Sequence, residues 1–321
     1  MNMDEYIWDW KNFYVWLQKV REGMPPLIIS VAITGGMHGK EANENLPETP
    51  EEQAQQTYEA YKEGASIVHV HARNPDAWFL TSSDSEHYRK VNTLIREKCP
   101  DIIINNTTGG GPHLTQEQRM ASVFANPELC SLNLGPMAIK MKLKERLEPL
   151  PSPRPEFPLE MCLPIDFNEV STYAKAMKEN GIKPEMELYH SGQYWVVQDL
   201  IMQGLIEPPY DIQFVMGMQT GAFPTPPNLF ALINELPPQS LFFVIGIGYY
   251  QLPMNTISIL LGGHVRVGLE DNVYFAKGRK MQSNAEAVAR IAHIARELNR
   301  EIATPAQARE MLGVSQEPSQ Y

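Results

Sequence analysis

Short apolar runs alternate along this chain with longer amphipathic segments, and this alternation constrains the fold more than any other feature. The apolar runs have the length and composition of buried strands, and the segments between them have the apolar spacing of surface helices. We predict strands at residues 27–33, 67–71, 102–106, 129–134, 185–189, 212–216, 241–245 and 265–269. We predict helices at about residues 49–64, 84–98, 115–125, 168–180, 192–204, 226–236, 254–261 and 284–300.

Eight strands that alternate with eight helices, mostly through short links, indicate βα units and a parallel sheet. The first of these helices carries clear boundary signals. Thr49 is a capping residue, Pro50 fits the first helical position and Gly64 fits the C-terminal end. An α/β chain of this kind most economically forms a single-domain (β/α)8 TIM barrel, which takes about 250 residues. The alternative is an open, doubly wound sheet.

Two regions lie outside this alternation. Residues 136–164 are rich in proline, and we interpret them as an excursion after the fourth strand. Residues 1–24 form an N-terminal arm with the aromatic residues Tyr6, Trp8, Trp10, Phe13, Tyr14 and Trp16. Because so many aromatic side chains are unfavourable in water, we expect the arm either to close the bottom of its own barrel or to dock on a partner subunit. We assign residues 25–315 to the catalytic barrel domain.

The composition of the 321-residue chain is that of a folded globular protein, with 43% hydrophobic and 20% charged residues. No stretch approaches the roughly 18 apolar residues of a membrane-spanning helix, and the first residues do not resemble a secretory signal. The net charge of −11 argues against nucleic acid or an anionic membrane surface as a partner. Three widely spaced cysteines form neither a disulfide framework nor a thiolate metal site, so we expect a cytoplasmic protein.

Two histidines share one face of the second predicted strand. His69 and His71 are two residues apart, so both side chains point to the barrel axis while Val68 and Val70 face the helices. Two imidazoles inside a barrel need hydrogen-bond partners or a metal ion. The pair suits Zn²⁺ or another divalent metal, with a third ligand from a different strand. The alternative is two structural histidines bonded to backbone or carboxylate groups.

Charged residues at the end of the eighth predicted strand can complete such a site. Arg266 and Glu270 share one face, and Asp271 follows directly. In a closed barrel the eighth strand lies close to the first two, so Glu270 can reach the histidine pair. Two histidines and one carboxylate leave coordination positions open for substrate, as catalysis requires. Arg266 offers a fork for a carboxylate and Asp271 is a candidate base, whereas a purely salt-bridged strand end is the alternative.

The third predicted strand is followed by Thr107, Thr108 and three consecutive glycines at 109–111. Backbone N–H groups of such a loop can approach an anion closely. The Gly-Lys-Ser/Thr sequence of a phosphate-binding P-loop is missing, so a carboxylate is a better ligand here than a triphosphate. A simple turn has the same composition and remains the alternative.

The fourth and fifth predicted strands also carry polar residues at alternate positions. Ser131 and Asn133 share one face of the fourth strand. Glu185, Glu187 and Tyr189 share one face of the fifth. Three such residues are out of place against helices, so we expect them in the barrel lumen.

Several of these segments resemble the β-keto acid cleavage enzyme family. The resemblance runs from about Pro26 to Glu310, and the histidine-bearing block and the Glu-Asp-Asn block are together specific. It implies a zinc-dependent barrel that forms homotetramers and converts a β-keto acid and acetyl-CoA into acetoacetate and an acyl-CoA. The matching sequences are Ala32-Ile-Thr-Gly35, Leu46-Pro-Glu-Thr-Pro-Glu-Glu52, His69-Val-His-Ala-Arg73, Thr108-Gly-Gly110, Ser131-Leu-Asn133, Glu185-Met-Glu-Leu-Tyr189 and Gly262-Gly-His-Val-Arg-Val-Gly-Leu-Glu-Asp-Asn272.

The resemblance implies a role for each matching residue. It makes His69, His71 and Glu270 the expected zinc ligands. It makes Arg266 and Asp271 the expected acid–base pair. The expected substrate contacts are Thr107, Gly110, Ser131, Asn133 and Glu187.

Met37 departs from the family pattern in a way that affects the substrate. Members that act on an amino-substituted keto acid have a glutamate for the ammonium group shortly after the first strand, where this chain has Met37. An ammonium group beside a methionine is desolvated without a partner. We therefore count Met37 among the substrate contacts and predict a β-keto acid with a neutral tail, unless a nearby His38, Glu41 or Glu44 supplies a charge.

Two other functions compete with this reading. One is a metal-dependent aldolase or hydrolase of the same barrel type that acts without CoA. The other is a metal-binding or ligand-sensing barrel without catalysis, which the charges of Arg266 and Asp271 make less suitable.

Overall fold

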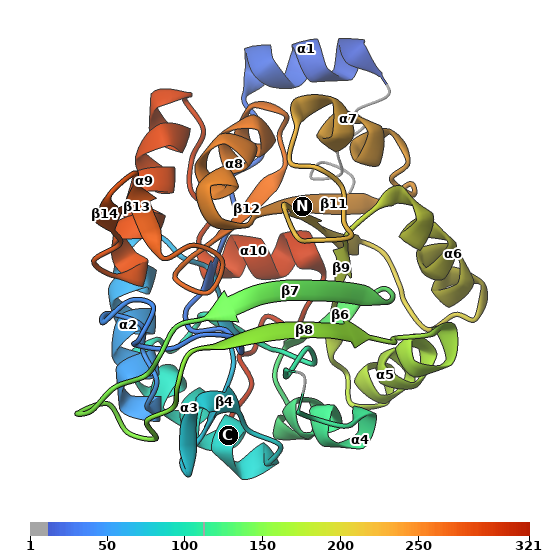
Figure 1. The fold of residues 1–321 in the computed structure, drawn as a ribbon. Helices are drawn as coiled ribbons and strands as arrows, with labels where there is room; N and C mark the ends of the chain where they lie inside the picture. The colour runs from blue at the N-terminus through green and yellow to red at the C-terminus, as the bar shows by residue number, and fades with distance from the viewer. Residues whose placement is uncertain (1–11, 112) are drawn as a thin grey trace.

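Eight parallel strands form a closed barrel at the positions predicted from the sequence (Figure 1). The computed structural model describes residues 12–111 and 113–321. In the sheet β1 pairs with both β2 and β12, so the barrel closes and the open-sheet alternative is wrong. The barrel strands are β1 (Ile29–Ala32), β2 (Ile67–Val70), β5 (Ile103–Asn106), β6 (Leu129–Asn133), β9 (Lys183–Leu188), β10 (Tyr210–Met216), β11 (Ser240–Gly246) and β12 (His264–Val267).

Helices surround the barrel and connect its strands (Figure 1). They are α2 (Pro50–Glu63), α3 (Ser85–Lys98), α4 (Gln116–Arg119) with the 3-10 helix η2 (Met120–Ala125), α5 (Phe167–Glu179), α6 (Tyr194–Met202), α7 (Pro226–Asn234), α8 (Gln251–Leu260) and α9 (Asn284–Glu297). Thr49 caps α2 as predicted, and Gly64 ends it with a left-handed φ of 115° that glycine adopts without strain. Two short 3-10 turns, η3 (Ser191–Gln193) and η4 (Gly248–Tyr250), precede α6 and α8.

The bottom of the barrel is closed by a C-terminal helix, α10 (Pro305–Leu312). Its buried side chains Ala308, Met311 and Leu312 share one apolar cluster with residues at the beginnings of the barrel strands, among them Ile67 and Ile103. The expectation that the N-terminal arm performs this role is therefore wrong for its described part, because α10 already occupies the space.

The described part of the arm forms helix α1 (Phe13–Glu22), which lies outside α7 and α8 (Figure 1). None of its residues is buried, and Phe13, Tyr14, Leu17 and Val20 are exposed. The aromatic residues Tyr6, Trp8 and Trp10 lie outside the described residues. Among the helices that the structure describes, none has both the length and the apolar character needed to cross a bilayer.

The proline-rich excursion after β6 is an antiparallel hairpin of β7 (Met137–Leu143) and β8 (Phe157–Leu163). It crosses the face of the barrel opposite α10 (Figure 1). Two shorter strand pairs decorate other loops, β3 (Arg73–Asn74) with β4 (Ala77–Thr81), and β13 (Tyr274–Ala276) with β14 (Arg279–Lys280). The hairpin matters most for function because it stands over the ends of the strands that carry the predicted site.

Candidate active site

A cavity of about 210 Å³ lies at the C-terminal ends of the barrel strands. In barrels of this type the loops at this end carry the chemistry. Nine of the eleven site residues predicted from the sequence line it, although they come from six separate segments of the chain. These are Met37, His69, His71, Thr107, Asn133, Glu187, Arg266, Glu270 and Asp271.

The remaining two predicted residues, Gly110 and Ser131, do not line the cavity. Gly110 is buried with a φ of 62°, and a side chain there would press on Leu114, so this glycine serves the turn of the loop. The hydroxyl of Ser131 lies 3.5 Å from that of Thr107 and accepts a hydrogen bond from the Thr108 N–H. Ser131 therefore supports the loop that presents Thr107.

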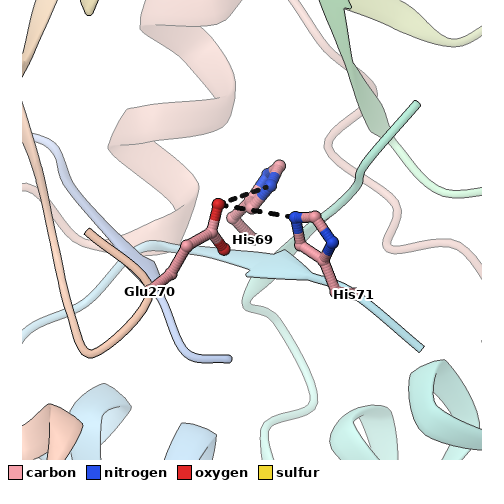
Figure 2. A group of neighbouring side chains, drawn as sticks. All are labelled: His69, His71 and Glu270. Carbon is pink, nitrogen blue, oxygen red and sulfur yellow. Dashed lines mark ion pairs between the residues drawn. The ribbon is translucent and has the colours of Figure 1, made fainter. Parts of the chain in front are cut away.

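His69, His71 and Glu270 converge on one point, with one ligand atom of each residue within 4.8 Å of the others. Glu270 Oε1 lies 3.7 Å from His69 Nε2 and 3.4 Å from His71 Nε2. Figure 2 shows both imidazoles turned toward the same carboxylate. The strand parity that predicted a shared face for the histidines is therefore confirmed, as is the reach of Glu270 across the closed barrel.

These three side chains fit a divalent metal ion. Both histidines direct Nε2 inward and Nδ1 outward, where His69 Nδ1 lies 3.9 Å from Glu185 Oε1 and His71 Nδ1 lies 3.4 Å from Thr81 Oγ1. His69 Nδ1 and Glu270 Oε2 are buried without a hydrogen-bond partner among the described residues. Two imidazole nitrogens and one carboxylate are a common set of catalytic zinc ligands.

The protonation states of the site also suit a metal. Burial lowers the pKa of His69 well below its usual value, and the charge of Arg266 adds to this effect, so the imidazole stays neutral and can act as a ligand. Burial by itself raises the pKa of Glu270, but Arg266, His71 and His69 outweigh it and hold that pKa well below the usual range. Glu270 is therefore a carboxylate.

Two glycines allow the backbone to place Glu270. Gly268 has a φ of 134°, and a Cβ there would lie 2.2 Å from the carbonyl oxygen of Ala32, so only glycine lets the loop after β12 approach β1 this closely. The Glu270 N–H then donates to that same carbonyl. Gly35 has a φ of 67°, and a Cβ there would lie 2.7 Å from Glu270 Cγ. The carboxylate thus rests against the loop that follows β1.

Arg266 joins the acidic groups of the site. Its Nε and Nη2 donate to Asp271 at 3.0 and 2.9 Å, and Nη2 also donates to Glu270 Oε1 at 2.6 Å. Its Nη1 donates to Glu187 Oε1 at 3.0 Å. The side chain is only 4% exposed, so these charge-assisted bonds form out of bulk water and keep the guanidinium in one orientation.

Burial raises the pKa of Asp271 to about 7, although Arg266 opposes this effect. Burial also raises the pKa of Glu185 well above its usual value. Glu185 is fully buried and faces His69 and Arg266, at 3.9 and 3.8 Å, so the prediction that this face of the strand points into the lumen is confirmed. Of these two buried acids, Asp271 lines the cavity and Glu185 does not.

Another part of the cavity wall is polar and includes Tyr189, Asn133, Glu187 and Thr107. The hydroxyl of Tyr189 lies 2.7 Å from Asn133 Oδ1 and 3.0 Å from Glu187 Oε2. Thr107 Oγ1 accepts a hydrogen bond from the Gly109 N–H at 3.0 Å. These groups can orient a carboxylate or a tetrahedral oxygen opposite the metal-binding side chains.

Sequence reasoning missed the cavity residues that come from the hairpin and from later loops. They are Met137, Ile139, Met141, Met161 and Leu163 of the hairpin, Val215 at the end of β10, and Met218 and Ile247 in the loops after β10 and β11. A usable signal was present, because residues 137–143 and 157–163 alternate between apolar and polar or small residues in the period of a strand.

Comparison with known proteins matches a family described as beta-keto acid cleavage enzyme over residues 26–314. The 3-keto-5-aminohexanoate cleavage enzyme of Acetoanaerobium sticklandii is 37% identical over 91% of this chain and 100% of that protein. The 3-oxoadipate:acetyl-CoA acetyltransferase of Cupriavidus necator is 34% identical over 90% of this chain and 95% of that protein.

Among solved structures, ObcA in a binary complex with oxaloacetate has a similar fold, with a TM-score of 0.65. It is 18% identical, and the match covers 84% of this chain and 67% of that chain. At this identity the comparison supports the barrel alone.

Proposed function

Because this chain belongs to the β-keto acid cleavage enzyme family, we propose that it exchanges acyl groups between a β-keto acid and acetyl-CoA, producing acetoacetate and an acyl-CoA. The convergence of His69, His71 and Glu270 beside the Arg266–Asp271 pair carries the proposal. One cavity thereby combines three metal-binding donors with a carboxylate held by an arginine, which suits proton removal next to a carbonyl group.

We propose that His69, His71 and Glu270 hold Zn²⁺. When bound, the ion supplies Lewis acidity to the keto oxygen of the substrate, which is worth several kcal/mol as charge develops there. The open side of the three-residue set leaves room for substrate oxygens.

Asp271 is the proposed base, which removes a proton from C2 of the keto acid. Arg266 holds the Asp271 carboxylate through two hydrogen bonds and thereby orients it for this step. The C2 carbanion attacks the acetyl-CoA carbonyl and releases the CoA thiolate. The thiolate attacks the former keto carbon, and the bond between C2 and C3 breaks to give the acyl-CoA and a carbanion at C2. Protonated Asp271 returns its proton to C2, which completes acetoacetate and restores the base.

Thr107, Asn133 and Glu187 are the proposed polar contacts of the substrate. The N–H groups of Gly109 and Gly111 are bonded within the loop, to Thr107 Oγ1 at 3.0 Å and to the Gly109 carbonyl at 2.6 Å, so side chains rather than these N–H groups are the proposed contacts of the substrate carboxylate. Gly110 and Ser131 act indirectly in this proposal, by supporting that loop.

Met37 supports a neutral tail on the keto acid. The two acidic neighbours of Met37 do not supply a charge to the tail. Glu41 binds Arg146 and Arg154, and Glu44 is exposed with Lys280 3.8 Å away. An ammonium tail beside Met37 would therefore lose its hydration without gaining a partner.

We also propose that the barrel, residues 25–315, is the catalytic unit of a homotetramer and that the arm, residues 1–24, contacts another subunit. The exposed apolar side chains of α1 support this assignment. The free cysteines Cys99, Cys130 and Cys162 fit a reducing compartment such as the cytoplasm.

The test incubates purified, metal-loaded protein with 3-oxohexanoate or 3-keto-5-aminohexanoate, with and without acetyl-CoA, and identifies products by mass spectrometry. We expect butanoyl-CoA and acetoacetate from 3-oxohexanoate only when acetyl-CoA is present. We expect kcat/KM for 3-oxohexanoate to exceed kcat/KM for 3-keto-5-aminohexanoate by about tenfold. This ratio corresponds to about 1.4 kcal/mol in the transition state. Cleavage without acetyl-CoA supports an aldolase or hydrolase instead, and metal binding without any product supports a sensing barrel.

Replacement of Arg266 by lysine should lower kcat by about 10- to 150-fold. A single ammonium group cannot span Asp271, Glu187 and Glu270, and each lost charge-assisted hydrogen bond costs about 1.5–3 kcal/mol. Arg279→Lys, which alters an exposed ion pair with Glu286, is the control and should leave kcat unchanged. If Arg266→Lys turns over at the wild-type rate with wild-type thermal stability, the fork geometry is unnecessary.

A further inference from the structure

The β7–β8 hairpin is amphipathic, and its apolar face covers the active-site cavity. Along β7, Met137 and Ile139 are buried, whereas Lys140 and Lys142 are exposed. Along β8, Met161 is partly buried, whereas its neighbours Glu160 and Cys162 are exposed. The hairpin therefore has one apolar face and one face with exposed ion pairs, such as Lys140 with Glu160 at 3.1 Å. The cavity is lined from this hairpin by Met137, Ile139, Met141, Met161 and Leu163.

Contacts at two places hold the hairpin over the cavity. On the side of β10, the Ala138 N–H donates to Thr220 Oγ1 at 3.2 Å, and Gln219 Nε2 donates to the carbonyl of Lys140 at 2.7 Å. Beyond the end of β7, the fully buried Arg146 binds Glu41 and Glu48, each at 2.8 Å. Glu41 and Glu48 lie in the loop that carries Met37, so the hairpin and that loop form one continuous wall.

The rest of this wall carries no charge that could meet a charged substrate tail. Met37, Met218 and Ile247 continue the apolar surface from the loops after β1, β10 and β11, and Val215 adds to it from the end of β10. Of the described residues that line the cavity, the charged ones all belong to the reaction centre. His38 also lines it, but its Nε2 lies 3.4 Å from the Leu269 carbonyl and burial lowers its pKa, so it is neutral.

We propose that the β7–β8 hairpin forms the acyl-tail subsite of this enzyme and that this subsite selects β-keto acids with a saturated hydrocarbon tail. The inference rests on the proposed acyl exchange and narrows its substrate class from neutral tails to apolar ones. Burial of each methylene group against this wall favours binding by about three- to fourfold. Five methionines in one wall, with flexible and polarizable side chains, adapt to tails of different length.

The first experiment measures kcat/KM for a series of keto acids that differ only in the tail. We expect kcat/KM to rise by about three- to fourfold per methylene from 3-oxopentanoate to 3-oxohexanoate, and to stop rising once the cavity of about 210 Å³ is filled. We expect 3-oxoadipate, with a carboxylate tail, to react at least about tenfold less well than 3-oxohexanoate. A flat series, or a preference for either a carboxylate or an ammonium tail, overturns the inference.

The second experiment places a charge on each face of β8. Met161→Lys puts an ammonium group into the tail subsite, so we expect kcat/KM to fall about tenfold or more for 3-oxohexanoate and to rise for 3-oxoadipate. Cys162→Lys puts the same group on the outer face one residue away, and we expect the ratio of the two substrates to stay at its wild-type value. If the ratio of kcat/KM for 3-oxohexanoate to that for 3-oxoadipate is the same in Met161→Lys and Cys162→Lys, the hairpin does not form the tail subsite.

A milder variant keeps the inference testable if Met161→Lys does not fold. Met161→Ala enlarges the subsite, and we expect the preferred tail to lengthen, with 3-oxooctanoate gaining on 3-oxohexanoate. An unchanged chain-length profile in a folded Met161→Ala protein contradicts the assignment.

The experiments distinguish a failure of the proposed acyl exchange from a failure of the hairpin inference. If no keto acid yields an acyl-CoA, the acyl exchange is wrong. Calorimetric titration of 3-oxohexanoate and 3-oxoadipate into the metal-loaded protein then still decides tail selectivity, because it requires no turnover. If acyl-CoA forms but charged tails are preferred, the acyl exchange stands and the hairpin inference is wrong.

Discussion

Replacement of Asp271 by asparagine is expected to lower kcat by about 10²–10⁴-fold, the usual contribution of a general base. The amide has nearly the shape of the carboxylate, but its one oxygen can accept only one of the two hydrogen bonds that Arg266 donates to Asp271 in the wild type. It cannot accept a proton from substrate C2. Asp271 is not among the three converging metal-binding residues, so we expect metal content to stay at the wild-type level.

The measurement pairs kcat from the acyl-CoA assay with metal content from elemental analysis of the same sample. Asp199→Asn, at a half-buried position on α6 that does not line the cavity, is the control and should change neither value. Near wild-type turnover in Asp271→Asn shows that another group removes the proton. Loss of metal in this variant instead assigns Asp271 a structural role at the metal centre.

The second large effect is expected from the double variant His69→Ala/His71→Ala. Removal of both imidazoles leaves Glu270 as the one remaining donor of the set, so bound metal should fall from about one ion per chain to almost none. Since the ion contributes several kcal/mol to the reaction, turnover should fall by at least about 10³-fold. Elemental analysis after metal loading and dialysis measures the first effect, and the acyl-CoA assay the second.

His293→Ala removes an exposed imidazole on α9 and serves as the matched control. Circular dichroism should show the wild-type content of helix and strand in all variants, because the substitutions do not touch the apolar cluster at the bottom of the barrel. Full retention of metal by the double variant places the metal elsewhere and overturns the ligand assignment. Metal-free wild-type protein after loading overturns it as well.

The fold was predictable because its information is local. The period of the apolar residues identifies each strand and helix, and the alternation of the two types leads to a parallel barrel. The same local rule predicted which residues share a face, as with His69 and His71 on β2. Closure of the barrel, seen in the pairing of β1 with β12, then brings the loop after β12 to that pair.

The roles of Gly110 and Ser131 show where local reasoning ends. Both lie at the correct ends of strands, but the turn at 109–111 directs Gly109 and Gly111 to the cavity and leaves Gly110 buried. Ser131 points at the loop of Thr107. A pattern of residues identifies the strand end, whereas the path of the loop decides which atoms reach the substrate.

The sequence by itself determined the barrel, the shared face of the two histidines and the position of the carboxylates at one end of it, because each depends on periodicities of a few residues. Only the tertiary structure decided that α10 closes the barrel bottom and that the described part of the arm, helix α1, does not, because the α10 side chains already fill the space below the strands. Tertiary structure also decided that the excursion returns over the cavity, since Arg146 meets Glu41 and Glu48 across about a hundred residues of chain. Contacts at such separation depend on how the whole chain packs, and no local pattern encodes them.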